Sequence, residues 1–341
     1  MRFYWEIKKK YRFLRRWIND HSSLIWWFHS FYALFFGIVF MWLGNKHIHY
    51  LQAALWYLAF IWISSLLMPK IQCYLLLSDI WRHRLQLFIN YVHRNFYQQI
   101  LFFLLPIYYK SASVWVVHGW FLSILAISAL LSTLDLIYDH HISRKWSYMA
   151  LFFSFNMFVS FYAMIPLMWK VSCIVALWLS GLLAVICFAS FVYHGSGLPV
   201  SRQKRIILAA ALLVIGLALF ARRYIPAVPL QYNGGWCGMN FNYTNKVLVD
   251  SMVILPQSIQ GRVYFFTRVD APVGMVESLV HIWYLDGVLI YRSASVEIKG
   301  GRPGGFRFWS YKNLALTSCD QSLIIETITT SGQLVGRSRI H

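Results

Sequence analysis

The chain has 341 residues, of which 59% are hydrophobic, 18% aromatic and only 13% charged. Soluble domains carry roughly 25% charged residues, so this composition excludes an ordinary soluble protein and indicates a membrane protein. The formal net charge of +19 does not indicate nucleic-acid binding, because 21 of the 31 Lys and Arg residues precede residue 224 and lie mostly between or beside apolar runs. We therefore expect membrane lipids, and no nucleic acid, as partners of these cations.

Residues 1–22 contain seven basic residues and precede the first apolar run. Their apolar residues recur at spacings of three and four: Phe3, Ile7, Tyr11, Leu14 and Ile18. This pattern predicts a basic amphipathic helix on the membrane surface, with a helix packed on a soluble partner as the alternative. No small-residue cleavage site follows, so we expect the segment to be retained as an anchor.

Five apolar runs are long enough to cross roughly 30 Å of hydrocarbon. They are Ser23 to Leu43, His49 to Met68, Ser113 to Thr133, Ser147 to Trp169 and Val171 to Tyr193. A sixth run, Ile206 to Phe220, is shorter, but basic residues flank it on both sides and their long side chains can reach outward. The segment Tyr97 to Tyr109 either crosses as well or dips in and returns, and residues 81–96 before it resemble a second surface helix.

The distribution of basic residues bears on the number of crossings. Seven crossings with a cytoplasmic N-terminus place 16 basic residues inside and 5 outside, whereas six crossings place 15 inside and 6 outside. The positive-inside rule therefore favours seven crossings only slightly. Residues 23–223 are accordingly predicted to form an all-α membrane domain of about seven spans.

From residue 224 the long apolar runs give way to period-two alternation and turn signals. The stretch "HIWYLDGVLIYRS" predicts a hairpin around Asp286 and Gly287, a favoured two-residue turn. About seven short strands in residues 224–341 are typical of an all-β antiparallel sandwich with an immunoglobulin-like outline, although a barrel gives a similar pattern. The expected strands are Lys246 to Val253, Gly261 to Val269, Leu279 to Leu285, Val288 to Ser293, Phe306 to Ser310, Ser322 to Thr329 and Gln333 to Ile340.

The runs "VYFFTRVDAP", "HIWYLDG", "GGFRFWSYKNL" and "GQLVGRSRI" carry a family resemblance. Over roughly the last 90 residues the chain resembles the bacterial domain of unknown function 2914. The apolar part before it is similar in layout to the multi-span domain joined to that module in inner-membrane proteins of Gram-negative bacteria. The resemblance implies a bacterial inner-membrane location, and it supplies no catalytic residue.

Five side chains of the β-domain are candidates for a binding surface. His281 and Trp283 share one face of a predicted strand, and Arg307 and Trp309 share one face of another, with Ser310 at the edge. If both faces lie on one side of one sheet, they form a platform suited to a glycan, an anionic headgroup or a partner peptide. The alternative is that Trp and Arg stack across neighbouring strands and merely cover a half-exposed sheet.

Other chemistry-bearing residues have simpler interpretations. Asp135 and Asp139 lie one helical turn apart beside two histidines, but a neighbouring Arg and Lys favour a charge-balanced loop over a metal site. The depths of His29 and His118 in their spans differ, which argues against haem, and Asn156 is interpreted as a helix-packing residue. The run "GGRPGG" is interpreted as a loop, since no helix follows it. Because no nucleotide, CxxC, HExxH or GxSxG motif is present, we expect no cofactor.

Two of the five cysteines, Cys237 and Cys319, belong to the β-domain and are predicted to form a disulfide. Such a bond persists in the periplasm, so it favours seven crossings and an outward domain. Two unpaired thiols in a cytosolic domain are the alternative.

Two functions remain open from the sequence. The first is a non-enzymatic inner-membrane protein that anchors a periplasmic β-sandwich for binding an envelope protein or glycan. The second is a membrane enzyme or lipid carrier with its site among the spans and the sandwich as a regulatory cap.

Overall fold

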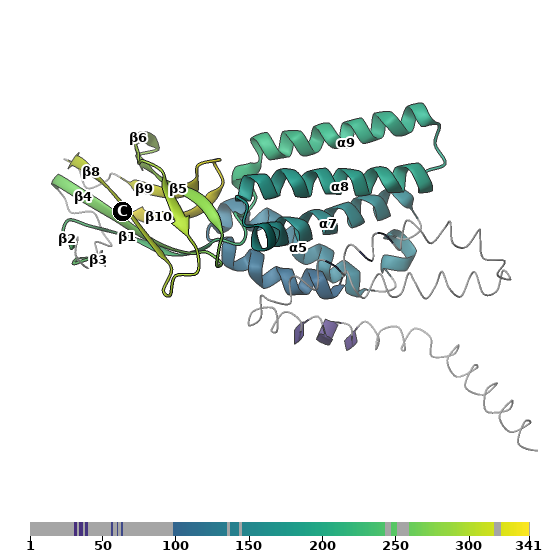
Figure 1. Cartoon of the computed structure of the whole chain (residues 1–341), viewed down its shortest axis with the longest axis horizontal. Helices are drawn as coiled ribbons and strands as arrows, with labels where there is room; N and C mark the ends of the chain where they lie inside the picture. The colour runs from purple at the N-terminus through teal and green to yellow at the C-terminus, as the bar shows by residue number, and fades with distance from the viewer. Residues whose placement is uncertain are drawn as a thin grey trace, which may run out of the picture.

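The computed structural model describes residues 98–134, 137–142, 145–242, 247–250, 259–316 and 322–340, and a few helical residues between 31 and 63. A bundle of apolar helices forms one end of this part of the chain, and a β-domain forms the other (Figure 1). Several predicted features lie outside the described residues: the surface helices at 1–22 and 81–96, most of the first two spans, and His29, Asp135 and Cys319.

The helices agree with the apolar runs. Residues 98–111 are helical, so the predicted segment Tyr97 to Tyr109 is helical over its described residues, 98–109. Four longer helices follow, each long and apolar enough to cross a membrane. They are α5 (Trp115–Thr133), α7 (Trp146–Trp169), α8 (Cys173–Gly195) and α9 (Val200–Phe220), with a short π-helix η1 (Tyr138–Ile142) and a 3-10 turn η2 (Arg222–Tyr224). α9 begins six residues before its apolar run, because Arg and Lys in its first turns are good helix formers.

α7 lies at the centre of the bundle and α9 at its edge. Most residues of α7 from Ala150 to Pro166 are buried, and the hydroxyl of Tyr108 ties the helix at 98–111 to α7 by donating to the Val159 carbonyl at 2.7 Å. In α9 the buried residues are Gln203 and Ala218, while its leucines are largely exposed. A peripheral helix with an exposed apolar surface is expected to contact lipid.

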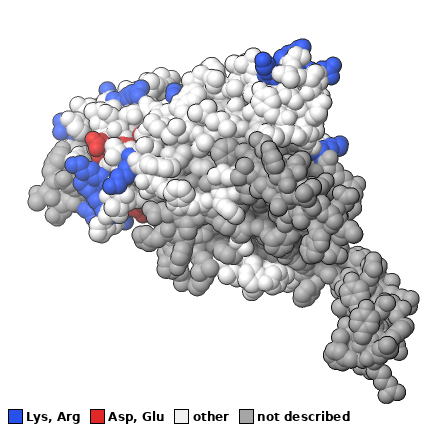
Figure 2. Space-filling model, turned by 45° about the vertical axis from the view of Figure 1, so that its right-hand side comes forward, with Lys and Arg blue, Asp and Glu red and all other residues white. Residues whose placement is uncertain are grey.

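The described helices alternate in direction, so their connections gather at two ends of the bundle. Residues 112–114, 170–172 and 221–230 lie at the β-domain, where the Ser113 hydroxyl donates to the Val335 carbonyl. The connections at 134–145 and 196–199 lie at the opposite end (Figure 1). On the face shown in Figure 2, Lys and Arg lie on the β-domain and at the far end of the bundle, and the described surface between them is uncharged.

The β-domain consists of antiparallel strands in two main sheets. The first sheet has the order β1-β4-β8, with β1 (Gln231–Gly238), β4 (Ile259–Asp270) and β8 (Phe306–Leu316). The second has the order β10-β9-β5-β6, with β7 also paired to β5, and contains β5 (Val276–Leu285), β6 (Val288–Arg292), β7 (Val296–Lys299), β9 (Leu323–Thr329) and β10 (Leu334–Ile340). A short pair, β2 (Phe241–Asn242) and β3 (Val247–Leu248), flanks the first sheet.

The hydrophobic core lies between the two main sheets. Val263 and Phe265 of β4 pack with Trp283 of β5 and Ile325 of β9. The hairpin between β5 and β6 is confirmed: Asp286 and Gly287 both have positive φ, at 48° and 82°, as a type I′ turn requires. The antiparallel all-β class is therefore confirmed, but this strand order does not bear out the immunoglobulin-like outline.

Candidate functional site

The candidate platform residues belong to two different sheets and point in different directions. His281 and Trp283 lie on β5 and are completely buried, and Ser310 of β8 is buried beside them. Arg307 and Trp309 alternate with Ser310 along β8, so they lie on the outer face of the first sheet, where Arg307 is exposed. The five side chains therefore do not form one platform. Strand alternation predicted correctly which side chains share a face of each strand. It could not show that the two strands belong to facing sheets.

His281, Trp283, Ser310 and Thr267 form a hydrogen-bonded network in the β-domain core. Trp283 Nε1 donates to Ser310 Oγ at 3.0 Å, and Ser310 Oγ lies 2.8 Å from His281 Nδ1. On the other side of the ring, His281 Nε2 lies 3.0 Å from Thr267 Oγ1, which donates to the Phe308 carbonyl. Phe308 also stacks on the imidazole, with ring centroids 3.8 Å apart.

The network fixes one tautomer of His281. Because the Trp283 N–H can only donate, Ser310 Oγ accepts that hydrogen bond. The Ser310 hydroxyl then donates its own hydrogen bond to His281 Nδ1. Because Thr267 donates to a carbonyl, it accepts from the Nε2 proton. The ring is therefore neutral, in agreement with burial, which holds the pKa of His281 well below its usual value. The close Ser310–His281 pair is thus a buried structural contact that satisfies core polar groups, with no open face at which a substrate could meet the hydroxyl.

The outer face of the β1-β4-β8 sheet carries a cluster of aromatic rings. The ring of Phe241 stacks on Tyr264 with centroids 5.4 Å apart and packs against Trp309 at 5.2 Å. Two further pairs extend the cluster to both sides, Trp236 with Phe266 and Tyr264 with Tyr311. Trp236 is 41% and Tyr311 47% exposed, so two rings of the cluster present much of their surface.

Three arginines lie on the same outer face. The guanidinium of Arg262 lies 4.7 Å from the centroid of the Tyr311 ring, a cation–π contact. Arg268 of β4 is directly opposite Arg307 of β8 in the strand register. We call this set, Trp236, Arg262, Arg268, Arg307, Trp309 and Tyr311, the outer face.

A buried ionic cluster joins the β-domain to the helix bundle. Glu326 of β9 is 1% exposed and accepts from Arg223, which follows α9, at 2.6 and 2.8 Å. Arg337 of β10 donates to the same carboxylate from Nε at 2.9 Å and from Nη2 at 2.6 Å. Each arginine makes two hydrogen bonds to the carboxylate, and together they satisfy it from both sides of the junction.

Two more polar contacts hold the same junction. The backbone N–H of Cys173, the first residue of α8, donates to the Glu277 carboxylate at 2.8 Å, so a β-domain side chain caps a helix of the bundle. Gln333 Nε2 donates to the Tyr162 hydroxyl at 2.7 Å, and that hydroxyl donates to the Pro226 carbonyl. The β-domain is therefore fixed on the bundle by buried, directional bonds.

Sequence reasoning missed this junction. A signal was present: Glu326 stands within the apolar run "LIIETIT", and a carboxylate there needs a buried partner. The pair Arg222 and Arg223 was assigned to lipid anchoring, whereas Arg223 binds Glu326. Long-range pairing of this kind depends on the three-dimensional arrangement and leaves no local pattern.

The remaining candidates have diverse outcomes. The Cys237 thiol is free and buried in the structure, and Cys319 lies outside the described residues, so the predicted bridge stays a prediction. His118 and Asn156 are both buried inside the bundle. Among the described residues, no three His, Cys, Asp or Glu side chains gather as a metal site would require.

These features define a class of protein: an apolar helical bundle, compatible with a membrane protein, that carries a firmly docked antiparallel β-domain. The chain belongs to the family of unknown function DUF5924, whose family profile matches residues 7–264. This family differs from domain of unknown function 2914, so the coarser expectation of a domain of unknown function is supported and the specific one is not. No curated protein and no solved structure matches the chain significantly.

Proposed function

We propose that this protein is an integral inner-membrane protein that holds its β-domain at the periplasmic surface, where the outer face binds an anionic glycan of the cell envelope. The observation that carries the proposal is the combination of exposed aromatic rings with three arginines on one sheet face. Flat aromatic rings stack on the apolar faces of sugar rings, and guanidinium groups bind carboxylates. An acidic glycan offers both groups.

The charge of the outer face supports an anionic ligand over a neutral one. Arg262, Arg268 and Arg307 lie on it, against one carboxylate at the described outward positions of β4 and β8, that of Asp270 at the end of β4, which accepts a hydrogen bond from Asn233 at 2.6 Å. Three cations on about 20 Å of strand give a local positive potential that attracts an acidic polymer and orients it along the strands.

The orientation rests on the positions of the chain reversals. The helix at 98–111 ends at the β-domain, which supports its crossing from the opposite side and hence seven spans. With seven spans, the reversals opposite the β-domain belong to the basic, cytoplasmic side. The β-domain is then periplasmic, where envelope glycans are present.

The docked junction supports a binding role in which position matters. Glu326, Glu277 and Gln333 hold the domain to the bundle by buried hydrogen bonds, so the outer face is kept at a fixed height above the membrane. A rigidly presented surface loses little orientational freedom on binding a fixed polymer, which improves affinity.

The direct test is cosedimentation of the full chain in detergent with purified peptidoglycan sacculi, whose sugars and stem-peptide carboxylates supply both chemistries. We expect Trp309→Ala and Arg307→Ala each to reduce the pelleted fraction severalfold. The matched control is Leu289→Ala on β6, since Leu289 is 58% exposed and lies on the other sheet. Binding that is unchanged in both outer-face variants would contradict the proposal. An enzymatic or lipid-carrier activity that is lost when Asn156 in α7 is substituted would instead favour a site among the spans.

A further inference from the structure

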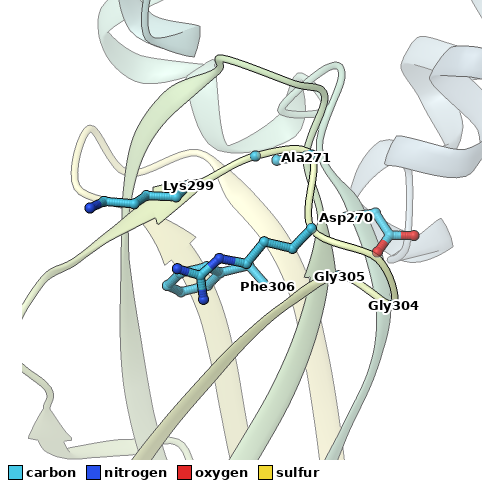
Figure 3. Close-up of a pocket in the computed structure, with 9 residues that line it drawn as sticks. Asp270, Ala271, Lys299, Gly304, Gly305 and Phe306 are labelled. Atoms are coloured by element: carbon cyan, nitrogen blue, oxygen red, sulfur yellow. The ribbon is translucent and has the colours of Figure 1, made fainter.

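A small cavity opens at the end of the β-domain that faces the helix bundle. Its volume is about 140 Å³, and it lies between the end of β4 and the loop from β7 to β8 (Figure 3). Its lining includes Lys299, Arg302, Phe306 and the glycines of the "GGRPGG" loop. Drug-sized ligands occupy roughly 300–1,000 Å³, so the cavity suits a small group such as a single phosphate.

The glycines shape the cavity. A side chain at Gly300 would collide with the carbonyl oxygen of Pro272, and Gly301 and Gly304 have φ values of 81° and 75°, which favour glycine. The N–H of Gly301 donates to the Ala271 carbonyl at 2.9 Å and pins the loop to the end of β4. The wall of the cavity is therefore backbone without side chains, held in a fixed position.

Two cations supply the polar part of the lining. Lys299 and Arg302 are both exposed, and the Arg302 guanidinium is steadied 5.0 Å from the centroid of the Phe306 ring. Asp270 also lines the cavity, and its carboxylate accepts a hydrogen bond from Asn233 Nδ2 at 2.6 Å, so the lining holds two cations and one carboxylate. Figure 3 shows the side chains of Lys299 and Asp270 pointing to opposite sides of the cavity. The balance of charge at the cavity is therefore positive and suits an anion.

The cavity lies level with the ends of the helices. The adjoining loop carries Gly274, where an added Cβ would meet Cε of Lys170, the residue that ends α7, at 2.8 Å. Val273 in the same loop is 82% exposed and packs beside Gly301. An exposed valine, a third cation and a small positive cavity at the ends of apolar helices lie where phospholipid headgroups meet water.

We propose that this cavity binds the phosphate of an anionic phospholipid headgroup and that the side chains of Lys299 and Arg302 contact this phosphate. The inference goes beyond the proposed glycan binding, because it concerns another surface and holds whichever side of the membrane the β-domain occupies. Bound lipid would tie the rim of the β-domain to the bilayer at a point separate from the Glu326 junction. Since each cation near an anionic headgroup contributes roughly fivefold in affinity, loss of both should weaken binding at least tenfold.

The test uses the full chain in detergent, titrated with dioctanoyl phosphatidylglycerol or dioctanoyl phosphatidylcholine, with bound lipid counted by native mass spectrometry. We expect the wild type to retain phosphatidylglycerol in preference to phosphatidylcholine. The double variant Lys299→Gln, Arg302→Gln should lose that lipid at least tenfold. Both residues are exposed, so the thermal unfolding midpoint should not change.

The matched control is Arg339→Gln. Arg339 is also exposed but lies on β10 about 20 Å along the strands from the helix-facing end. Equal lipid retention by the double variant and the wild type, or an equal loss in the control, would overturn the proposal. Millimolar inorganic phosphate serves as the competitor. Failure of phosphate to displace the lipid supports the lipid source, and full displacement would assign the cavity to a soluble anion instead.

Discussion

Arg223 Nη2 lies 2.6 Å from Glu326 Oε1, although 103 residues separate the two in sequence. The arginine lies in η2, three residues after the last helix of the bundle ends, and the carboxylate is buried in the β-domain. Together with the Glu277 and Gln333 contacts, this pair joins the two parts of the chain into one structural unit.

Glu326→Gln should destabilise the folded protein at the junction between the β-domain and the bundle. The change leaves two guanidiniums at the junction without their carboxylate, and we expect a loss of about 2 kcal/mol in the free energy of unfolding. This is below the roughly 3–5 kcal/mol of a fully buried pair, because the Arg223 and Arg337 side chains remain 39% and 29% exposed. A shift of the thermal unfolding midpoint in detergent measures it. Glu297→Gln, an exposed carboxylate on β7, is the control and should not shift.

Ser310→Ala should destabilise the β-domain by about 2 kcal/mol. Without the hydroxyl, the Trp283 N–H and His281 Nδ1 are both left buried without this partner, and unsatisfied buried groups cost roughly 1–3 kcal/mol. Chemical unfolding followed by tryptophan fluorescence measures the change. Ser295→Ala, at an exposed position, should be neutral. A Ser310→Ala protein as stable as the wild type would show that the assigned network does not exist.

Stability should fall on acidification through His281. The unfolded histidine takes up a proton near pH 6.5, whereas burial lowers the pKa of the folded one far below that value. Between these two values the unfolded state binds more protons, so the free energy of unfolding decreases as the pH falls, by up to about 1.4 kcal/mol per pH unit. His281→Gln should lose this component, which a comparison of unfolding midpoints between pH 7 and pH 5 detects. Identical pH slopes in both proteins would contradict a neutral buried ring.

The elements that local patterns specify were predictable from the sequence. The last four apolar runs became α5, α7, α8 and α9, and Asp286-Gly287 formed its hairpin turn. Hydrophobic periodicity and turn chemistry act over a few residues, so a single sequence contains them.

Strand pairing and side-chain partners were not predictable. The strands that contain His281 and Arg307 were both predicted correctly. The two strands belong to sheets that face one another across a core, however, and do not lie side by side. Likewise, Arg223 looked like a lipid anchor because nothing near it in sequence is acidic. Both errors arise because contacts between distant segments depend on topology, which alternation and charge counts do not encode.

In the proposed orientation, the β-domain faces outward, on the side of the membrane opposite the connection between α8 and α9. Two variants, each with one added cysteine, report the two sides of the membrane. Ser295→Cys is exposed on the β-domain, and Ser201→Cys is exposed at the start of α9. Labelling of spheroplasts with a membrane-impermeant maleimide, counted above the background of the native cysteines, is the most direct measurement. We predict that residue 295 labels in intact spheroplasts and that residue 201 labels only after permeabilisation. Labelling of residue 201 in intact spheroplasts, with residue 295 protected, would show the opposite orientation.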